Sequence, residues 1–190
     1  MDNIFSFLME MDRLKSVYRR AYIHDLSRNE NSAEHSWHLA IAVLALKDKF
    51  GGGVDIYRTI KMALVHDICE IGAGDKSIYD VERAGQEEKE RIYIESLKGN
   101  SVEITNEIVE LWEEYEAQST MESQWVKVVD RLLPFMMNLN TQGRTWKEQG
   151  VSRSQVLAVN KVISVMAPEI YIWVEGKVDY AVQKGWLVNS

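Results

Sequence analysis

The sequence has few of the residues that cross-link, interrupt or anchor a chain. It contains a single cysteine, Cys69, which excludes a disulfide framework within the chain and is typical of a reducing compartment. Only two prolines and eleven glycines interrupt its 190 residues, which favours long regular elements. No run of about 18 uncharged apolar residues occurs, and the first residues do not resemble a signal peptide. We therefore expect a cytoplasmic protein with no transmembrane helix.

Positive charge is also in short supply, because 22 basic residues face 29 acidic ones and give a net charge of −7. A globally acidic protein is poorly suited to gripping the phosphate backbone of nucleic acids, so we expect neither a nucleic-acid polymer nor a membrane as partner. A small anionic substrate is not excluded, since a site can be locally positive. Of the four histidines, three lie in segments that could carry chemistry.

The spacing of apolar residues is helical almost throughout, and we find no convincing strand alternation, so we predict an all-α fold. Capping patterns occur at Asn31 with Glu34, at Ser119 with Glu122 and at Ser152 with Gln155. We expect helices over residues 4–14, from the cap at 31 to 50, from 55 or 57 to 71, 86–97, 102–115, from the caps at 119 and 152, and from 168 to about 185. We expect a loop or short helix at 75–85 and a polar loop at 141–150.

His66 and Asp67 lie in an otherwise apolar segment, residues 60–71, which we predict to be helical. Glu70 follows His66 by four residues and Asp67 by three, so a helix would place all three side chains on one face. Three ionisable groups crowded on an apolar helix are costly unless a partner such as a divalent cation pairs with them. The alternative is a solvated helix end, at which Asp67 and Glu70 simply face water.

His35 and His38 are three residues apart near the start of the preceding helix, so they share a face and could chelate a metal together. The alternative is one ligand and one structural histidine. We favour His35 as the ligand, because it lies in the first turn beside a polar loop. His38 lies one turn deeper among apolar residues, and we interpret it, like His24, as structural.

Asp130 is the third candidate, and it lies in an apolar segment of a later helix. Its alternative is a salt bridge to Arg131 or Lys127. Taken together, His35, His66, Asp67 and Asp130 offer two imidazoles and two carboxylates. This mixed set suits one divalent ion such as Mn, Co, Fe, Ni or Zn, and suits Mg less well. Four protein ligands would leave positions open for water and substrate, as in catalytic sites.

The ordered set His35, His66-Asp67 and Asp130 in a helical chain resembles the signature of the HD-domain phosphohydrolase superfamily. Four further segments resemble its group of small 5′-deoxynucleotidases: residues 34–36, 64–70, 74–75 and 111–116. The resemblance covers about residues 14–134. It implies a single HD domain over residues 1–190, with a core over about 14–140 and C-terminal helices at 152–190 packed on it.

The resemblance also implies roles for individual residues. The metal ligands would be His35, His66, Asp67 and Asp130. The acid of the HDxxE motif and the aspartate of the next Gly-Asp step, which are Glu70 and Asp75 here, would act in catalysis. An arginine upstream of the first histidine, which corresponds to Arg19, would contact the substrate phosphate. Without the resemblance, Arg19 would be interpreted as a solvated cation at a helix end.

One substrate position departs from the family pattern. The aromatic residue that follows the arginine and helps to reject ribonucleotides is replaced by Arg20, and the nearest aromatic residue is Tyr22. Selectivity for deoxyribose is therefore not predicted from this position. Arg28 and Lys76 are further candidate anchors for the phosphate.

The sequence thus predicts a metal-dependent phosphohydrolase, in the form of a 5′-nucleotidase that converts (deoxy)ribonucleoside 5′-monophosphates to nucleoside and phosphate. A metal ion and an arginine in one pocket would neutralise the anionic substrate and its transition state. The alternatives are a phosphodiesterase acting on another small phosphoester and a non-enzymatic regulator that binds a metal or a nucleotide. A homodimer is compatible with the six tryptophans and eight methionines. Met136, Met137 and Trp146 could serve an interface, although a core position is favoured for each.

Overall fold

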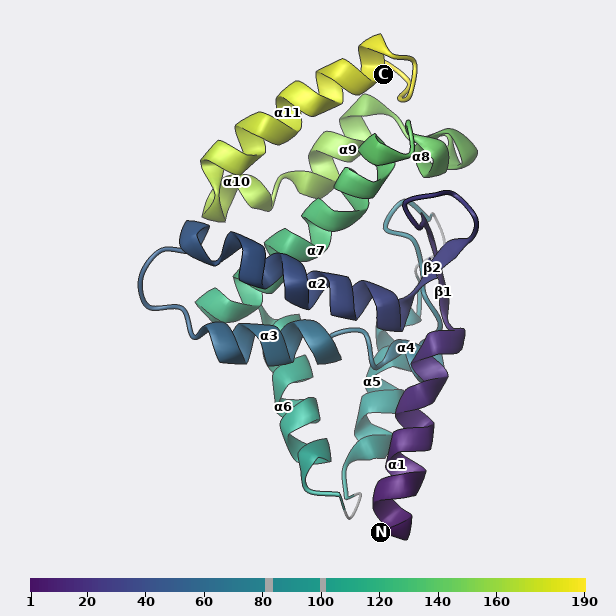
Figure 1. Cartoon of the computed structure of the whole chain (residues 1–190), viewed down its shortest axis with the longest axis vertical. Helices are drawn as coiled ribbons and strands as arrows, with labels where there is room; N and C mark the ends of the chain where they lie inside the picture. Colours follow the sequence, from purple (N-terminus) through teal and green to yellow (C-terminus); the bar gives the residue numbers. More distant parts are fainter. Residues whose placement is uncertain (81–83, 100–101) are drawn as a thin grey trace.

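The computed structural model describes residues 1–80, 84–99 and 102–190 (Figure 1). Helices predominate in this part of the chain, which confirms the predicted all-α class. They are α1 (Asp2–Asp12), α2 (Ser32–Leu46), α3 (Ile56–Val65), α4 (Glu70–Ala73), α5 (Gln86–Leu97), α6 (Ile104–Ala117), α7 (Met121–Asn140), α8 (Arg144–Gln149), α9 (Arg153–Asn160), α10 (Ile163–Met166) and α11 (Pro168–Gln183). Short 3-10 segments follow α1 and α2 at η1 (Arg13–Ser16) and η2 (Lys47–Lys49).

Two short strands form a feature that the sequence analysis did not predict. β1 (Tyr18–Tyr22) pairs antiparallel with β2 (Asn29–Asn31), and the register is irregular between its two ends. The segment of β1 lacks alternating apolar residues, so its pattern gives no strand signal. The hairpin leads directly into α2 and holds Arg19 beside the start of that helix.

Local capping chemistry was predicted correctly in two places and wrongly in one. Asn31 caps α2 and Ser152 caps α9, each as a complete capping box. α7, in contrast, is capped by Thr120 with Ser123 rather than by Ser119 with Glu122. The Glu122 carboxylate instead accepts a hydrogen bond of 2.7 Å from the backbone N–H of Asp55, the N-cap of α3.

The expected polar loop at 141–150 contains a helix, α8, whose Trp146 is buried in the core. This burial confirms the core position favoured for Trp146, whereas Met136 is 43% exposed. The backbone N–H of Trp146 donates to the side chain of Asn138 on α7. Packing of Trp146 into the core thus stabilises a helix in a segment whose composition predicts a loop. The loop expected at 75–85 is non-helical at 75–80, and residues 81–83 lie outside the described part.

The predicted helix that ends at residue 71 is divided in two. α3 ends at Val65, the chain turns through residues 66–69, and α4 begins at Glu70. Across this turn the N–H groups of Ile68 and Glu70 bond to carbonyls three residues back, which tightens the backbone relative to an α-helix. The simple helical-face argument for His66 and Glu70 is therefore wrong in detail.

α7 is the central helix, and it packs against α2, α3, α6, α9 and α10 (Figure 1). One apolar cluster joins α2, α3 and α7 to the C-terminal helices, and a second joins α1, α4, α5 and α6. Val65 packs against both clusters and immediately precedes His66. The candidate site therefore lies where the two parts of the core meet. None of the described helices is long and apolar enough to cross a membrane.

Candidate metal centre and substrate cleft

Three buried side chains from separate elements converge at the centre of the molecule. His35 comes from the first turn of α2, His66 from the turn after α3, and Asp130 from the middle of α7. One ligand atom from each lies within 4.8 Å of the others. Asp130 Oδ1 is 3.2 Å from His35 Nε2 and 3.9 Å from His66 Nε2. The structure thus brings together three of the four predicted ligands in one compact set.

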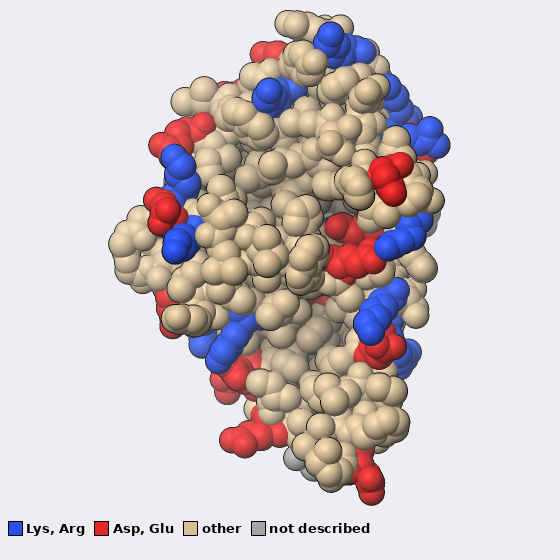
Figure 2. All heavy atoms as spheres, viewed as in Figure 1, with Lys and Arg blue, Asp and Glu red and all other residues tan. Residues whose placement is uncertain are grey.

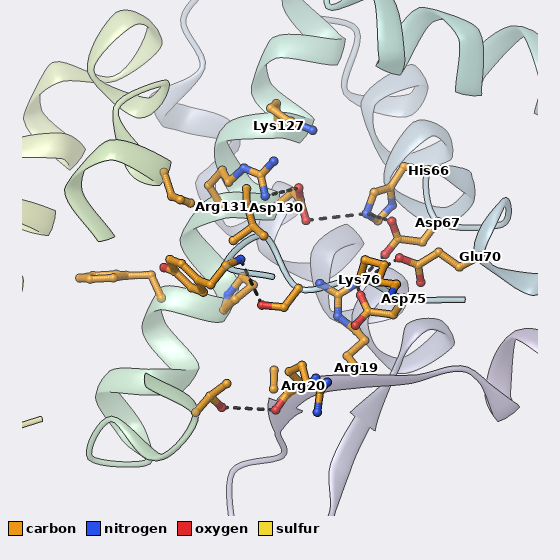
Figure 3. A pocket seen from close by; sticks show the side chains of 18 of the residues that line it. Arg19, Arg20, His66, Asp67, Glu70, Asp75, Lys76, Lys127, Asp130 and Arg131 are labelled. Atoms are coloured by element: carbon orange, nitrogen blue, oxygen red, sulfur yellow. Dashed lines mark hydrogen bonds and ion pairs between the residues drawn. The ribbon is translucent and has the colours of Figure 1, made fainter. Parts of the chain in front are cut away.

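The fourth predicted ligand, Asp67, borders this set (Figure 3). Its Oδ1 lies 3.1 Å from His66 Nε2, and its Oδ2 lies 3.9 Å from His35 Nε2. Two imidazoles and two carboxylates therefore face one small volume. This is the mixed nitrogen and oxygen donor set that first-row divalent ions prefer.

The hydrogen bonding of His66 fits a cation in that volume. Its Nδ1 lies 2.9 Å from the Ala63 carbonyl, which can only accept, so Nδ1 carries the proton. Nε2 then presents a lone pair, and it is buried with no hydrogen-bond partner. Burial also lowers the pKa of His66, which favours the neutral ring. A lone pair 3.1 Å from the Asp67 carboxylate is unfavourable unless a cation lies between them.

His35 is held from both of its ring nitrogens. Nε2 faces Asp130, and Nδ1 lies 3.5 Å from Oε2 of Glu30, a buried residue of β2. Burial and Arg19 lower the pKa of His35, but its hydrogen bonds with Asp130 and Glu30 outweigh them and raise it to about 9. The raised pKa favours a proton on the His35 ring, and a metal ion bound at Nε2 would take the place of that proton. Sequence reasoning missed Glu30, because nothing in its local segment indicates the contact with His35.

Arg19 lies on β1 and is buried among carboxylates rather than solvated. Its Nη1 donates to Asp67 Oδ2 at 2.8 Å and lies 3.7 Å from Asp75 Oδ1 and 4.0 Å from Glu70 Oε1. Burial opposes the charge of Arg19, but these carboxylates raise its pKa above its ordinary value. The solvated alternative for Arg19 is therefore wrong, and its cation lies next to the candidate metal ligands.

Glu70 and Asp75 complete the acidic side of the site. Burial raises the pKa of the Glu70 carboxyl well above its usual range, and the nearby Asp67 raises it further. The Ser32 hydroxyl donates a short hydrogen bond to Glu70. Asp75 follows Gly74, whose positive φ of 74° ends α4 and whose carbonyl accepts a hydrogen bond from Gln86. Burial also raises the pKa of Asp75.

The residues of this site lie within a segment that matches a known protein family. Residues 11–171 match the family model of the HD domain. The chain belongs to the HD-domain family.

Relatives of this HD-domain protein share only part of their length with it. The 5′-deoxynucleotidase HDDC2 of Bos taurus is 32% identical over 134 residues, which cover 68% of this chain and 63% of the relative. The 5′-deoxynucleotidase HDDC2 of Dictyostelium discoideum is 34% identical over 140 residues, which cover 69% of this chain and 73% of the relative. The chain thus spans less than two thirds of the bovine protein.

A solved structure is similar over nearly the whole chain. It is the crystal structure of a predicted metal-dependent phosphohydrolase from Magnetospirillum magnetotacticum MS-1, with 38% sequence identity and a TM-score of 0.91. The match covers 98% of this chain and 95% of that one. The similarity of fold therefore extends over the C-terminal helices of this chain as well as its core.

The remaining predicted substrate residues divide between the cleft and the surface. Lys76 lines the cleft beside Asp75 (Figure 3). Tyr22 donates to Glu148, and Arg28 forms an exposed ion pair with Glu34. Neither Tyr22 nor Arg28 belongs to the cleft lining in the described part of the HD-domain protein.

Two basic residues on α7 line the cleft of this HD-domain protein and were not assigned a substrate role from sequence. Lys127 and Arg131 are one helical turn apart and flank Asp130 (Figure 3). Arg131 Nη1 lies 3.9 Å from Asp130 Oδ2. The salt bridge considered as the alternative for Asp130 is therefore present in addition to its contacts with the histidines. Burial lowers the pKa of Lys127. Lys127 and Arg131 are four residues apart on the helix that carries Asp130, and this spacing is the sequence signal that could have identified them.

Proposed function

We propose that this HD-domain protein is a metal-dependent phosphomonoesterase that hydrolyses deoxyribonucleoside 5′-monophosphates to nucleoside and phosphate. The observation that carries the proposal is the buried Arg19, whose guanidinium lies within 4.0 Å of Asp67, Glu70 and Asp75 at the edge of the metal-ligand set. An arginine beside a cation site is suited to an anionic phosphoryl group. That two relatives are 5′-deoxynucleotidases supports this class of substrate.

The proposed metal ligands are His35, His66, Asp67 and Asp130. When bound there, a divalent ion such as Mn, Co, Fe, Ni, Zn or Mg would supply positive charge for the phosphoryl oxygens and activate a water near neutral pH. The partner-free Nε2 of His66 and the crowded carboxylates fit such an ion. Which of these ions serves is a matter for elemental analysis of the purified protein.

Arg19 and Lys76 are the proposed phosphate contacts. The planar guanidinium of Arg19 matches the spacing of two phosphate oxygens, and β1 fixes it at the floor of the cleft. Lys76 adds a point charge from the same side as Asp75. Both cations would hold the phosphate in place while charge builds up in the transition state.

Glu70 and Asp75 are the proposed proton-handling residues. Both carboxyls lie within 4.0 Å of Arg19 and therefore within reach of a phosphate that Arg19 binds. One would accept a proton from the attacking water, and the other would donate a proton to the leaving 5′ oxygen. Ser32 orients Glu70 through its hydrogen bond, whereas Asp75 depends on the turn at Gly74.

The test is a panel of nucleoside 5′-monophosphates offered to protein loaded with Co, Mn or Mg. Each deoxyribonucleotide is paired with its ribonucleotide, and a model phosphodiester and a 3′-monophosphate are included as further arms. We expect phosphate release from the deoxyribonucleoside 5′-monophosphates and loss of it in Asp130→Ala. Release from the diester alone would favour the phosphodiesterase alternative. Metal and nucleotide binding without turnover in the folded parent would favour the non-enzymatic regulator.

A further inference from the structure

Two cations on α7 line the cleft but take no part in the proposed function. Lys127 and Arg131 lie one helical turn apart on this helix. Figure 3 shows Lys127 at the top of the site and Arg19 at its lower side, with Asp130 between them. Arg19 donates to Asp67, whereas Arg131 lies 3.9 Å from Asp130. The cations of α7 therefore approach the candidate metal ligands from a different side than Arg19 does.

The guanidinium of Arg131 is largely buried and has little to bind. Its side chain is 21% exposed, and its ion pair with Asp130 spans 3.9 Å, which is beyond hydrogen-bond distance. Within residues 1–80, 84–99 and 102–190, no hydrogen bond engages its N–H donors. A guanidinium in a binding site commonly donates to two oxygens of one carboxylate or phosphate. Arg131 therefore offers unused donors to a ligand in the cleft.

The ammonium group of Lys127 is held in place without a counterion. Its Nζ donates a 3.0 Å hydrogen bond to the hydroxyl of Tyr115 and lies 4.7 Å from the centre of that ring. No carboxylate of the described part lies within 4.0 Å of Nζ. Lys127 is half-buried, and a cation that burial partly strips of water is costly without an opposite charge. An anion in the cleft would offset this cost.

Many cations elsewhere on the molecule have an acidic partner. Along the edges of the face shown in Figure 2, basic side chains lie next to acidic ones. Arg28 with Glu34 and Lys61 with Glu107 form such pairs, each at 2.6 Å. Acidic residues are in excess, since the net charge is −7. A shortage of acids therefore does not explain why Lys127 lacks a counterion.

We propose that Lys127 and Arg131 bind a second phosphate group of the nucleotide substrate. This inference rests on the proposed function, in which Arg19 and Lys76 hold the phosphate that is removed. A second phosphate offers two oxygens to the guanidinium of Arg131 and negative charge to Lys127. The substrate class is then a nucleotide with two phosphate groups, the second of which is joined either to the sugar or to the first phosphate.

The experiment measures nucleotide binding to the full chain, stripped of metal, by isothermal titration calorimetry. Hydrolysis needs the metal ion, so the ligands stay intact. The probes are deoxyadenosine 5′-monophosphate, deoxyadenosine 3′,5′-bisphosphate and deoxyadenosine 5′-diphosphate. A net charge of −7 by itself disfavours the more highly charged ligands. We expect at least one two-phosphate ligand to bind about tenfold more tightly than the monophosphate, because charge-assisted hydrogen bonds contribute about this much.

Substitutions assign this preference to the two residues. We expect Arg131→Gln to reduce the preference for the second phosphate to about twofold or less, and Lys127→Gln to reduce it in part. Arg153→Gln is the matched control, since Arg153 pairs with Asp179 on the surface, outside the cleft lining of the described part, and it should keep the preference of the parent. The ratio of two affinities within one variant removes any effect that the substitution has on both ligands alike. Far-UV circular dichroism checks the fold.

The position of the second phosphate follows from which ligand gains. A preference for the bisphosphate that depends on Arg131 places this group on the sugar, and one for the diphosphate places it beside the first phosphate. A parent that binds neither two-phosphate ligand more tightly than the monophosphate overturns the proposal. Retention of the full preference in both Arg131→Gln and Lys127→Gln also overturns it. Binding is measured without turnover, so a failure of phosphate release in the monophosphate panel is a separate result.

Discussion

At the scale of residues, the carboxylate of Asp130 is fixed through both of its oxygens. Oδ1 faces His35, and Oδ2 accepts a hydrogen bond of 3.1 Å from the hydroxyl of Tyr115 on α6. That hydroxyl in turn accepts a bond of 3.0 Å from Lys127 Nζ. Tyr115 also packs edge-on against the ring of His66, with the centroids 5.2 Å apart. It therefore acts as a positioning residue for two proposed metal ligands.

Tyr115→Phe removes the hydroxyl and leaves the ring that packs against His66. We expect the dissociation constant for Mn²⁺ or Co²⁺ to rise about tenfold, because partners that orient a metal ligand contribute to its affinity. Isothermal titration calorimetry on metal-stripped protein measures it. Tyr57→Phe is the matched control, since Tyr57 is 77% exposed, and its affinity should equal that of the parent. An unchanged affinity in Tyr115→Phe would contradict the positioning role.

The proposed ligands could be predicted from sequence, but the residues that hold them could not. His35, His66, Asp67 and Asp130 belong to short motifs whose residue types carry chemistry wherever they occur. Lys127 was considered only as a partner for Asp130. Glu30 lies outside the motifs, and Tyr115 lies in segment 111–116, which resembles the family but gave this residue no role. Both act through tertiary contacts, such as the hydrogen bond of Tyr115 with Asp130, 15 residues further along the chain. Such contacts depend on how the helices pack, which one sequence does not specify.

At the scale of elements, the short helix α4 depends on a close approach to α5. A Cβ atom added at Gly72 would lie 2.5 Å from Cδ2 of the Tyr93 ring, inside van der Waals distance. Tyr93 has little freedom to move, because its hydroxyl also donates a 2.8 Å hydrogen bond to Glu10 on α1. Packing among α1, α4 and α5 thus explains why glycine occupies position 72, although its backbone conformation does not require glycine.

Gly72→Ala should therefore destabilise the protein by about 1–3 kcal/mol through overpacking. Gly176 provides the matched control, since it lies inside α11 and an added Cβ would meet nothing within 4 Å. Gly176→Ala should stabilise the fold by about 0.5–1 kcal/mol through helix propensity. Urea unfolding of both variants measures the two values. Equal changes in the free energy of unfolding for the two substitutions would show that the close approach to Tyr93 does not affect stability.

An ion pair joins α3 to α6 and predicts a dependence of stability on pH. Burial raises the pKa of Glu114, but hydrogen bonds from Arg58 and Thr120 lower it below its ordinary value of 4.5. A carboxyl with a lowered folded pKa stabilises the fold above its unfolded pKa. That contribution is lost as the pH falls through the lowered folded pKa.

Glu114→Gln should lower the melting temperature at pH 7, and the difference from the parent should disappear in strong acid. Thermal unfolding followed at a series of pH values measures this difference. Glu110→Gln, an exposed position on the same helix, should show no such pH-dependent difference. A deficit in Glu114→Gln that persists unchanged below the lowered pKa would show that charge is not its cause.

Elements whose signals are local were predicted best. The cap of α2 lies within four residues, Asn31 to Glu34, and the structure confirms it. Pro168 also begins α11 as expected. The hairpin of β1 and β2, the helix around Trp146 and the division after Val65 were missed. Each of these features is stabilised by contacts with distant segments, which outweigh the local pattern.

At the scale of the whole molecule, the distribution of charge reconciles an acidic protein with an anionic substrate. Part of the −7 belongs to Asp67, Glu70, Asp75 and Asp130, which surround the proposed cation and Arg19. The cleft also gathers Lys76, Lys127 and Arg131. Bound metal and these basic groups would make the cleft locally positive while the rest of the surface stays acidic.

Titration of metal-stripped protein with Mn²⁺ or Co²⁺, with phosphate release from a deoxyribonucleoside 5′-monophosphate as the readout, tests whether the proposed site holds a catalytic metal ion. We expect no release without metal and a rate of release that rises until one ion is bound per chain. Asp130→Ala should remain inactive at the same metal concentrations. Phosphate release that is unaffected by stripping, or no release from a folded protein with one bound ion, would contradict metal-dependent hydrolysis at this site.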